Sequence, residues 1–209
     1  MLAGFVSKLC TLLQYIIFQQ IGTTWKADSF KGLMNFSFIL FEKVAVHFPV
    51  LIEVYIDAYA EMIAAELREI PATASSVLVI GSGSIPVTAI VLARKRPFHI
   101  TAIDIDVTAV IAAKKVIQSL KLDEQISIMQ DDGCTHSLDE YDVIFLLYGV
   151  AQQEMVLNRY EENGNPSSFL VVRSTSDDRS WISSGIDIKN VVYTTTLGAV
   201  YSFVLTAKK

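Results

Sequence analysis

Short apolar runs alternate with amphipathic stretches along the last two thirds of this 209-residue chain. Apolar runs of four to eight residues bounded by turn residues are typical of strands buried on both faces of a parallel sheet. The stretches between them have helical spacing, so they predict crossover helices that cover the sheet. We expect strands at 77–80, 99–103, 126–130, 143–147 and 169–173, with helices at 87–94, 107–120 and 152–161.

The pattern changes near the C-terminus. Asn190–Thr196 and Val200–Thr206 flank the short segment Leu197-Gly198-Ala199, and this arrangement predicts an antiparallel hairpin. A mostly parallel sheet that ends in an antiparallel hairpin is the layout of Rossmann-like methyltransferases. The predicted fold class is therefore α/β, with a seven-stranded sheet of this type.

The first 69 residues show no strand alternation. They predict about three helices, near 2–21, 29–45 and 49–69, before a linker at 71–75. We expect an N-terminal helical subdomain over 1–70, forming a lid over the ligand, and a nucleotide-binding domain over 75–209. The first helix is strongly apolar, but polar residues recur on one face, which favours an amphipathic helix over a signal peptide or a membrane span.

The strongest chemical signal lies where the first predicted strand ends, in Gly81-Ser82-Gly83. Glycines let the backbone approach a ligand closely, and Asp104, at the end of the second strand, could accept hydrogen bonds from ribose hydroxyls. A G-x-G-x-x-G dinucleotide loop would need a third glycine at position 86, which holds Pro86. This difference favours a ligand with an adenosine end and no phosphates, such as S-adenosylmethionine.

The ends of the other predicted strands carry further candidates, because ligands of open α/β sheets bind beyond the carboxyl ends of the strands. Asp132 or Asp131 could accept a hydrogen bond from the adenine amino group, although Asp-Gly is also ordinary turn chemistry. Asp106 is predicted to cap the following helix. The remaining expected cofactor contacts are Ile105, Gly133 and Tyr148, and Arg173 follows the fifth strand.

Composition narrows the classes of partner. The net charge is −5 and the sequence has no basic patch, which argues against a nucleic-acid substrate. Cys10 and Cys134 lie far apart, and the three histidines are scattered, so no metal site is predicted. Reduced thiols fit a cytoplasmic protein. We expect no membrane attachment, and the protein could form a homodimer.

Several segments resemble nicotianamine synthases. The loop GSGSIPVTAIVLA, which begins at Gly81, resembles that family's GSGPLPLTSIVLA, and YDVIFLL at 141–147 resembles YDVVFLA. LVVRSTSDDR at 170–179 resembles LMLRSAHGAR and keeps Arg173, Ser174 and Arg179. HFPVLIEVYIDAYAE at 47–61 is similar to a stretch beginning FPYY. The resemblance covers about 43–209.

The resemblance implies a methyltransferase-like domain that moves the 3-amino-3-carboxypropyl group of S-adenosylmethionine onto an amine and releases methylthioadenosine. It places Glu61 on the glutamate that deprotonates the amine. A solvent-exposed position for Glu61 stays equally open, because it is six residues from Tyr55 and falls away from the face that Tyr55 and Tyr59 share. Tyr55 and Tyr59 could line the same cavity or pack in the core. It also places Arg173 and Arg179 where one of them could contact a carboxylate of the ligand or acceptor. The implied acceptor is a small-molecule amine or amino acid.

The sequence also departs from the family pattern. Val50 and Leu51 replace the paired tyrosines, and Ser176-Asp177 replaces the His-Gly pair. Acceptor recognition is therefore predicted to differ, and the product need not be nicotianamine. Two other functions stay open at this point: a small-molecule N- or O-methyltransferase, and a non-catalytic protein that binds S-adenosylmethionine.

Overall fold

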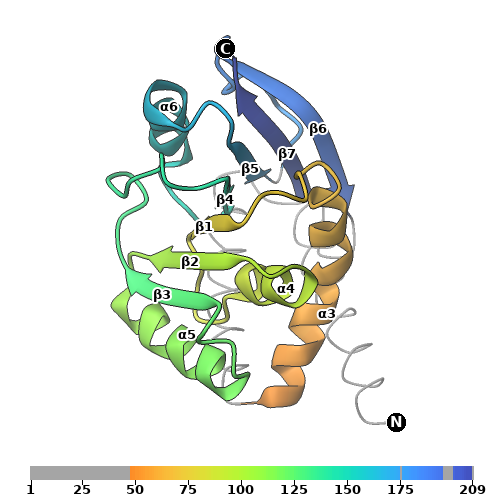
Figure 1. The fold of residues 1–209 in the computed structure, drawn as a ribbon, viewed down its shortest axis with the longest axis vertical. Helices are drawn as coiled ribbons and strands as arrows, with labels where there is room; N and C mark the ends of the chain where they lie inside the picture. The colour runs from red at the N-terminus through yellow and green to blue at the C-terminus, as the bar shows by residue number, and fades with distance from the viewer. Residues whose placement is uncertain (1–47, 175, 195–199, 209) are drawn as a thin grey trace, which may run out of the picture.

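The computed structural model describes residues 48–174, 176–194 and 200–208. Its centre is a seven-stranded sheet with the order β3-β2-β1-β4-β5-β7-β6 (Figure 1). β1 to β5 pair in parallel, and β7 runs antiparallel between β5 and β6. The predicted fold class is confirmed. The strands are β1 Ser76–Ile80, β2 His99–Asp104, β3 Ile126–Gln130, β4 Val143–Leu146, β5 Phe169–Ser174, β6 Ile186–Thr194 and β7 Val200–Ala207.

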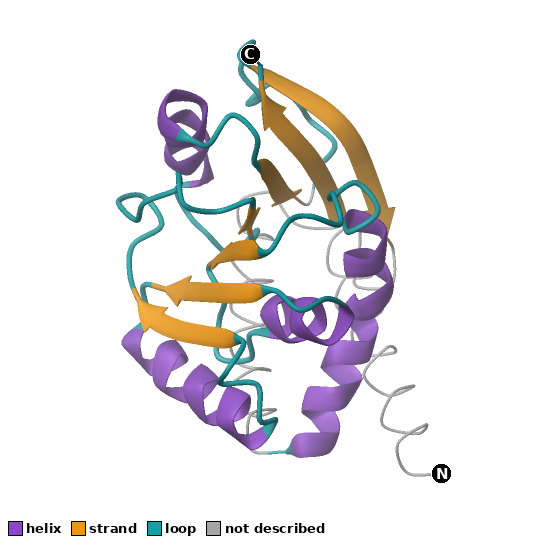
Figure 2. Ribbon diagram, in the orientation of Figure 1, coloured by secondary structure: helices purple, strands orange, loops and turns teal. Residues whose placement is uncertain are grey.

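Helices cover both faces of the sheet (Figure 2). Because side chains alternate along a strand, Val77 and Val79 of β1 pack into one core and Leu78 and Ile80 pack into the other. The first core also takes in α3, α4 and α5, whereas α6 packs into the second. These helices are α3 Pro49–Glu66, α4 Val87–Lys95, α5 Val107–Ser119 and α6 Gln153–Asn163.

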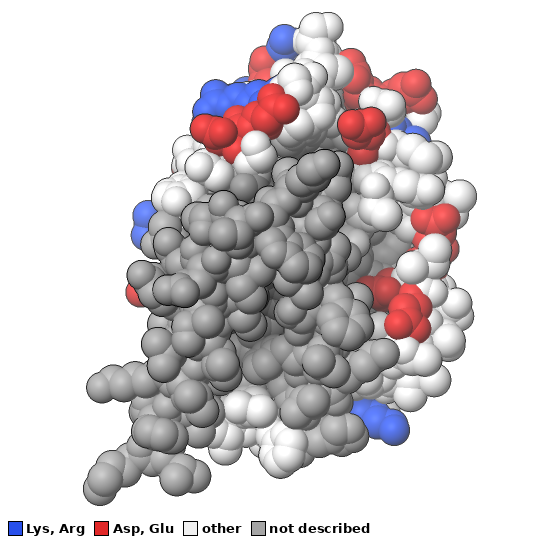
Figure 3. Space-filling view, turned by 180° about the vertical axis from the view of Figure 1, so that it is seen from behind, with Lys and Arg blue, Asp and Glu red and all other residues white. Residues whose placement is uncertain are grey.

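α3 is the third predicted N-terminal helix, and it begins with Pro49, whose fixed φ suits a first turn. The helices predicted near 2–21 and 29–45, and the hairpin turn at 197–199, lie outside the described residues. Among the helices that the structure describes, none has the length and apolar character needed to cross a membrane. On the face seen in Figure 3, described acidic and basic side chains lie next to one another at the top of the view and are scattered elsewhere along its edges.

Polar contacts fix α3 and the linker against the sheet domain. Arg94 of α4 forms a two-point ion pair with Glu53 of α3, with both N···O distances at 2.9 Å. Arg96 donates to the carbonyl oxygens of Leu67, Ile70 and Pro71 at 2.7–3.1 Å. These contacts fix α3 and the linker against α4.

Asp142 joins the start of β4 to the start of β1. Its Oδ2 accepts from the backbone N–H of Ser75 at 2.7 Å and of Ser76 at 3.0 Å. These hydrogen bonds, that of Ser75 foremost, lower the pKa of Asp142. A carboxyl whose pKa is lowered by folding stabilises the native state above its unfolded pKa and loses that contribution as pH falls through its folded pKa.

We therefore expect Asp142→Asn to cost about 1 kcal/mol of unfolding free energy at pH 7. The difference from wild type should shrink as pH falls below about 4, where the wild-type carboxyl also becomes neutral. Urea unfolding of both proteins across this pH range measures the difference. A difference that stays constant down to pH 2 would contradict the assignment.

Candidate active site

A cavity of about 450 Å³ lies beyond the carboxyl ends of β1, β2, β4 and β5. This is where open α/β sheets bind ligands. The structure brings all the predicted cofactor residues together around it: Gly81, Ser82, Gly83, Asp104, Ile105, Asp132, Gly133 and Tyr148. Tyr55, Tyr59 and Arg173 also line the cavity.

The glycine loop needs its two glycines for backbone conformation. Gly81 and Gly83 have φ angles of 80° and 68°, in the left-handed region that side chains with a Cβ rarely adopt. A Cβ added to Gly81 would also come within 2.6 Å of Val150 Cγ2. The N–H groups of Gly81 and Ser82 donate to Ile103 O at 2.9 and 3.1 Å, which ties the loop to the end of β2.

Asp104 shapes this loop as well as facing the cavity. Its Oδ2 accepts from Gly83 N–H at 2.8 Å, and its Oδ1 accepts from Asp106 N–H at 3.0 Å. Asp106 in turn caps α5 by accepting from Thr108 N–H at 2.8 Å, which confirms the predicted cap. One carboxylate therefore connects the glycine loop to the start of α5.

Ser82 provides a direct test of whether the cavity fits a polar ligand. The residue is 4% exposed, and its hydroxyl is buried with no hydrogen-bond partner among the described residues. A buried hydroxyl that lacks a partner costs about 1–3 kcal/mol. Because Ser82 lines the cavity, a polar group of a bound ligand could offset this cost.

Tyr55 and Tyr59 form the α3 side of the cavity. Their i, i+4 spacing places them on one face of the helix, and each is 5% exposed. Their rings meet edge to face with centroids 5.0 Å apart, and their hydroxyl oxygens are 3.4 Å apart. α3 thus presents a pair of coupled phenols to the cavity.

Behind these tyrosines lies a buried ion pair that the sequence did not reveal. Arg173 Nε and Nη2 donate to the two oxygens of Glu66 at 2.9 and 2.8 Å, and Nη1 donates to Thr88 Oγ1 at 2.8 Å. Ser202 Oγ donates to Glu66 Oε1 at 2.6 Å. Burial disfavours the charge on Arg173, but the adjacent Glu66 prevails and raises the pKa of Arg173. Together with Thr88 and Ser202, the ion pair connects α3, α4, β5 and β7.

The structure corrects the predicted position of Glu61. Its side chain is exposed and does not line the cavity. The buried face of α3 carries Tyr55, Tyr59 and Glu66, and position 61 falls off that face because it is six residues beyond Tyr55. The sequence carries one signal for the buried position of Glu66: it lies seven residues, or about two helical turns, after Tyr59 and therefore on the same face of the helix.

The two arginines also differ from the prediction. Arg179 is exposed and lies outside the cavity lining, so the structure does not place it near a ligand carboxylate. Arg173 does line the cavity, but the carboxylate it binds belongs to Glu66 of the protein itself. Within the described part of the chain, no group of three or more His, Cys, Asp and Glu side chains could hold a metal ion.

Comparisons with solved structures identify the class of fold. A mutant of MtNAS superposes with a TM-score of 0.72 at 16% identity, covering 100% of this chain and 90% of that chain. The mitomycin 7-O-methyltransferase MmcR gives a TM-score of 0.56 at 15% identity, covering 79% of this chain and 60% of that one. The fold is that of the Rossmann-like S-adenosylmethionine-dependent methyltransferases.

Sequence comparison gives the family. The sequence model of the nicotianamine synthase protein family matches residues 45–202. A nicotianamine synthase of Solanum lycopersicum is 28% identical to this chain, and its alignment covers 89% of this chain and 62% of the relative. The chain belongs to the nicotianamine synthase family. It spans 62% of the length of this curated relative.

Proposed function

We propose that this protein transfers the 3-amino-3-carboxypropyl group of S-adenosylmethionine to an amine of a small molecule and releases methylthioadenosine. The single observation that carries the proposal is the family match over 45–202, because this range contains the glycine loop and every described cavity residue. One solved structure is a mutant of MtNAS in complex with S-adenosylmethionine, and another is MtNAS in complex with MTA and tNA.

The residues around the cavity fit the parts of S-adenosylmethionine. We assign the ribose hydroxyls to Asp104, the adenine end to Ile105 and Asp132, and a polar group of the amino-acid end to the unpartnered Ser82 hydroxyl. Ile105 is 69% exposed, so a flat apolar ring covering it would remove apolar surface from water. The remaining proposed contacts are Gly81, Gly83, Gly133 and Tyr148.

When bound, S-adenosylmethionine supplies a sulfonium whose three attached carbons are all electrophilic. The protein selects among these carbons by holding the amine in line with one of them. An amine must lose a proton to attack, so a proton acceptor near the cavity is needed. With Glu61 exposed to solvent, we assign this role to the Tyr55–Tyr59 pair on the cavity wall. The carbon at the centre of the Arg173 guanidinium lies 5.8 Å from the centre of the Tyr59 ring.

We further propose that the acceptor is a small amine or amino acid and that it differs from the acceptor of typical family members. The support for this is in the sequence: Val50 and Leu51 stand where the family pattern has paired tyrosines, so two hydroxyl groups are absent at these positions. Cytoplasmic localisation, a homodimer, and the division into a helical subdomain over 1–70 and a cofactor-binding domain over 75–209 stay part of the proposal.

A crystal structure with S-adenosylmethionine tests this assignment. We expect the first carbon of the aminocarboxypropyl group to face the hydroxyls of Tyr55 and Tyr59, with the ribose at Asp104. A bound molecule whose methyl carbon faces these hydroxyls would instead support a small-molecule methyltransferase. A molecule bound without either carbon facing open cavity would support a non-catalytic binding protein.

A further inference from the structure

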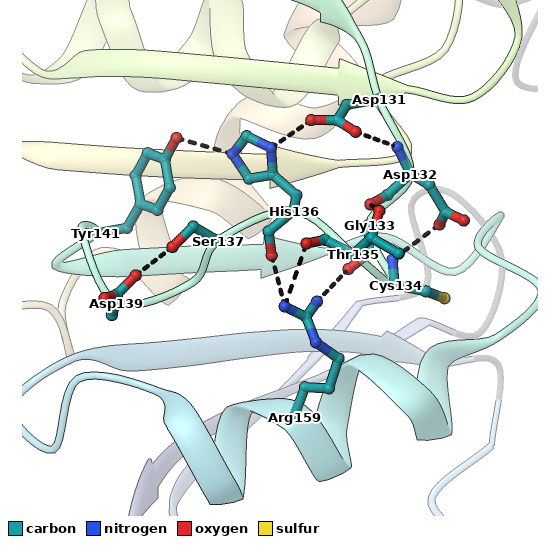
Figure 4. A network of polar contacts seen from close by, with 10 residues as sticks. All are labelled: Asp131, Asp132, Gly133, Cys134, Thr135, His136, Ser137, Asp139, Tyr141 and Arg159. Atoms are coloured by element: carbon teal, nitrogen blue, oxygen red, sulfur yellow. Dashed lines mark hydrogen bonds and ion pairs between the residues drawn. The ribbon is translucent and has the colours of Figure 1, made fainter.

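The loop after β3 forms one side of the cavity, and it is held by an arginine of α6, the helix that packs into the second core. Residues 131–134 of this loop line the cavity. Arg159 of α6 reaches the loop from below and donates to the carbonyl oxygens of Gly133, Thr135 and His136, at 3.2, 3.4 and 2.9 Å (Figure 4). We propose that Arg159 is a positioning residue that fixes this loop for cofactor binding, which rests on the function proposed above.

The loop has little room to move without disturbing the rest of the site. Gly133 is buried, and a Cβ added to it would come within 2.3 Å of Ile80 Cγ2. Ile80 is the last residue of β1 and directly precedes the glycine loop. A shift of the loop toward β1 would therefore press on Ile80, the residue directly before Gly81. Three carbonyl contacts from one rigid guanidinium set the distance between the loop and α6.

A second set of contacts, inside the loop itself, differs between Asp131 and Asp132. Asp131 Oδ2 pairs with His136 Nδ1 at 2.7 Å, and Asp131 Oδ1 accepts from Asp132 N–H at 2.8 Å. His136 Nε2 lies 3.1 Å from the Tyr141 hydroxyl (Figure 4). Both oxygens of Asp131 are thus engaged within the loop, and its pKa is lowered, chiefly by His136.

Asp132 is held differently. Its Oδ1 accepts from Cys134 N–H at 2.8 Å, and the Cys134 thiol also interacts with this carboxylate. Asp131 therefore maintains the shape of the loop through both of its oxygens, whereas the carboxylate of Asp132 contacts Cys134, and Asp132 lines the cavity. Arg159 holds the loop backbone next to the contacts of both acids. It donates to the carbonyl oxygen of Gly133, which directly follows Asp132, and to that of His136, whose ring pairs with Asp131.

The test measures the affinity of wild type, Arg159→Met and Arg159→Lys for S-adenosylmethionine and for methylthioadenosine by calorimetry. We expect Arg159→Met to weaken both ligands by about tenfold, because the loop loses three hydrogen bonds. Arg159→Lys keeps an ammonium donor and should lose only about two- to fivefold. In steady-state assays the KM for S-adenosylmethionine should rise while kcat changes less than about twofold, since the reacting carbon is held elsewhere. Arg68→Met, at an exposed arginine outside the cavity, is the matched control.

The possible outcomes distinguish a failure of this inference from a failure of the proposed function. Failure of wild type to bind S-adenosylmethionine would overturn the proposed function and this inference with it. Wild-type binding with unchanged affinity in folded Arg159→Met would overturn the inference alone. If Arg159→Met does not fold, Arg159→Lys decides, and wild-type affinity in that variant contradicts the proposal. Asp132→Asn should also weaken binding more than Asp131→Asn does, and the reverse order would contradict the assigned roles.

Discussion

Asp104→Ala is expected to weaken S-adenosylmethionine binding by about 1.5–3 kcal/mol, which is about 10- to 150-fold in Kd. Two effects combine in this variant. The ribose loses a charge-assisted hydrogen bond, and the glycine loop loses the acceptor of Gly83 N–H. Because this hydrogen bond restrains the backbone of Gly83, whose φ is 68°, we expect the loop to be less preorganised without it. Isothermal titration calorimetry measures the change.

Asp123→Ala is the control for Asp104→Ala. Asp123 is an exposed aspartate between α5 and β3, at the opposite end of the strands from the cavity. Its replacement changes the net charge by the same amount and should leave the affinity unchanged. Equal affinities of Asp104→Ala and wild type would remove Asp104 from the site, and NAD binding with similar affinity would contradict the argument from Pro86.

Glu66→Leu is expected to destabilise the protein by about 3–5 kcal/mol, because it leaves the Arg173 guanidinium buried without its counter-charge. Arg173 and Glu66 have side chains 2% and 0% exposed, so water cannot replace the lost partner. The double variant Glu66→Leu/Arg173→Met should recover most of the loss, since an apolar pair of similar volume replaces the ion pair. Urea unfolding of the single and double variants measures both values.

The ion pair Arg94–Glu53 is the matched control for this prediction. Its geometry is also a two-point contact, but its side chains are 38% and 48% exposed. Glu53→Gln should therefore cost less than about 1 kcal/mol. A Glu66→Leu variant that unfolds at the same urea concentration as Glu53→Gln would show that the buried pair does not hold α3 in place.

The sheet and the residues that line the cavity at the strand ends could be predicted from the sequence because their signals are local. Apolar runs locate strands such as β3 at Ile126–Gln130, and the parallel order brings the ends of β1 and β2 together. This strand order alone is enough to place Gly81, Gly83 and Asp104 close together, because they lie at or just after the ends of these two strands. The capping role of Asp106 is local as well.

On the α3 side of the site, the expected positions of Tyr55 and Tyr59 on the cavity wall agree with the structure, but the position of the acid does not. Successive residues of a helix differ by about 100° in direction, so a small error in alignment turns a side chain from the cavity to solvent. Glu61 and Glu66 lie on the same helix, but only Glu66 lies on the buried face. Its partner Arg173 is 107 residues further along the chain, and no local pattern reports such a pairing.

The nucleoside released from S-adenosylmethionine tests the central claim most directly. Wild-type protein is incubated with S-adenosylmethionine and a set of small amines and amino acids, and the nucleosides are separated by liquid chromatography and identified by mass spectrometry. Asp104→Ala serves as the control for release that does not depend on the site. Transfer of the aminocarboxypropyl group predicts methylthioadenosine, formed with wild type and strongly reduced with Asp104→Ala. Release of S-adenosylhomocysteine instead would show methyl transfer and contradict the proposed function.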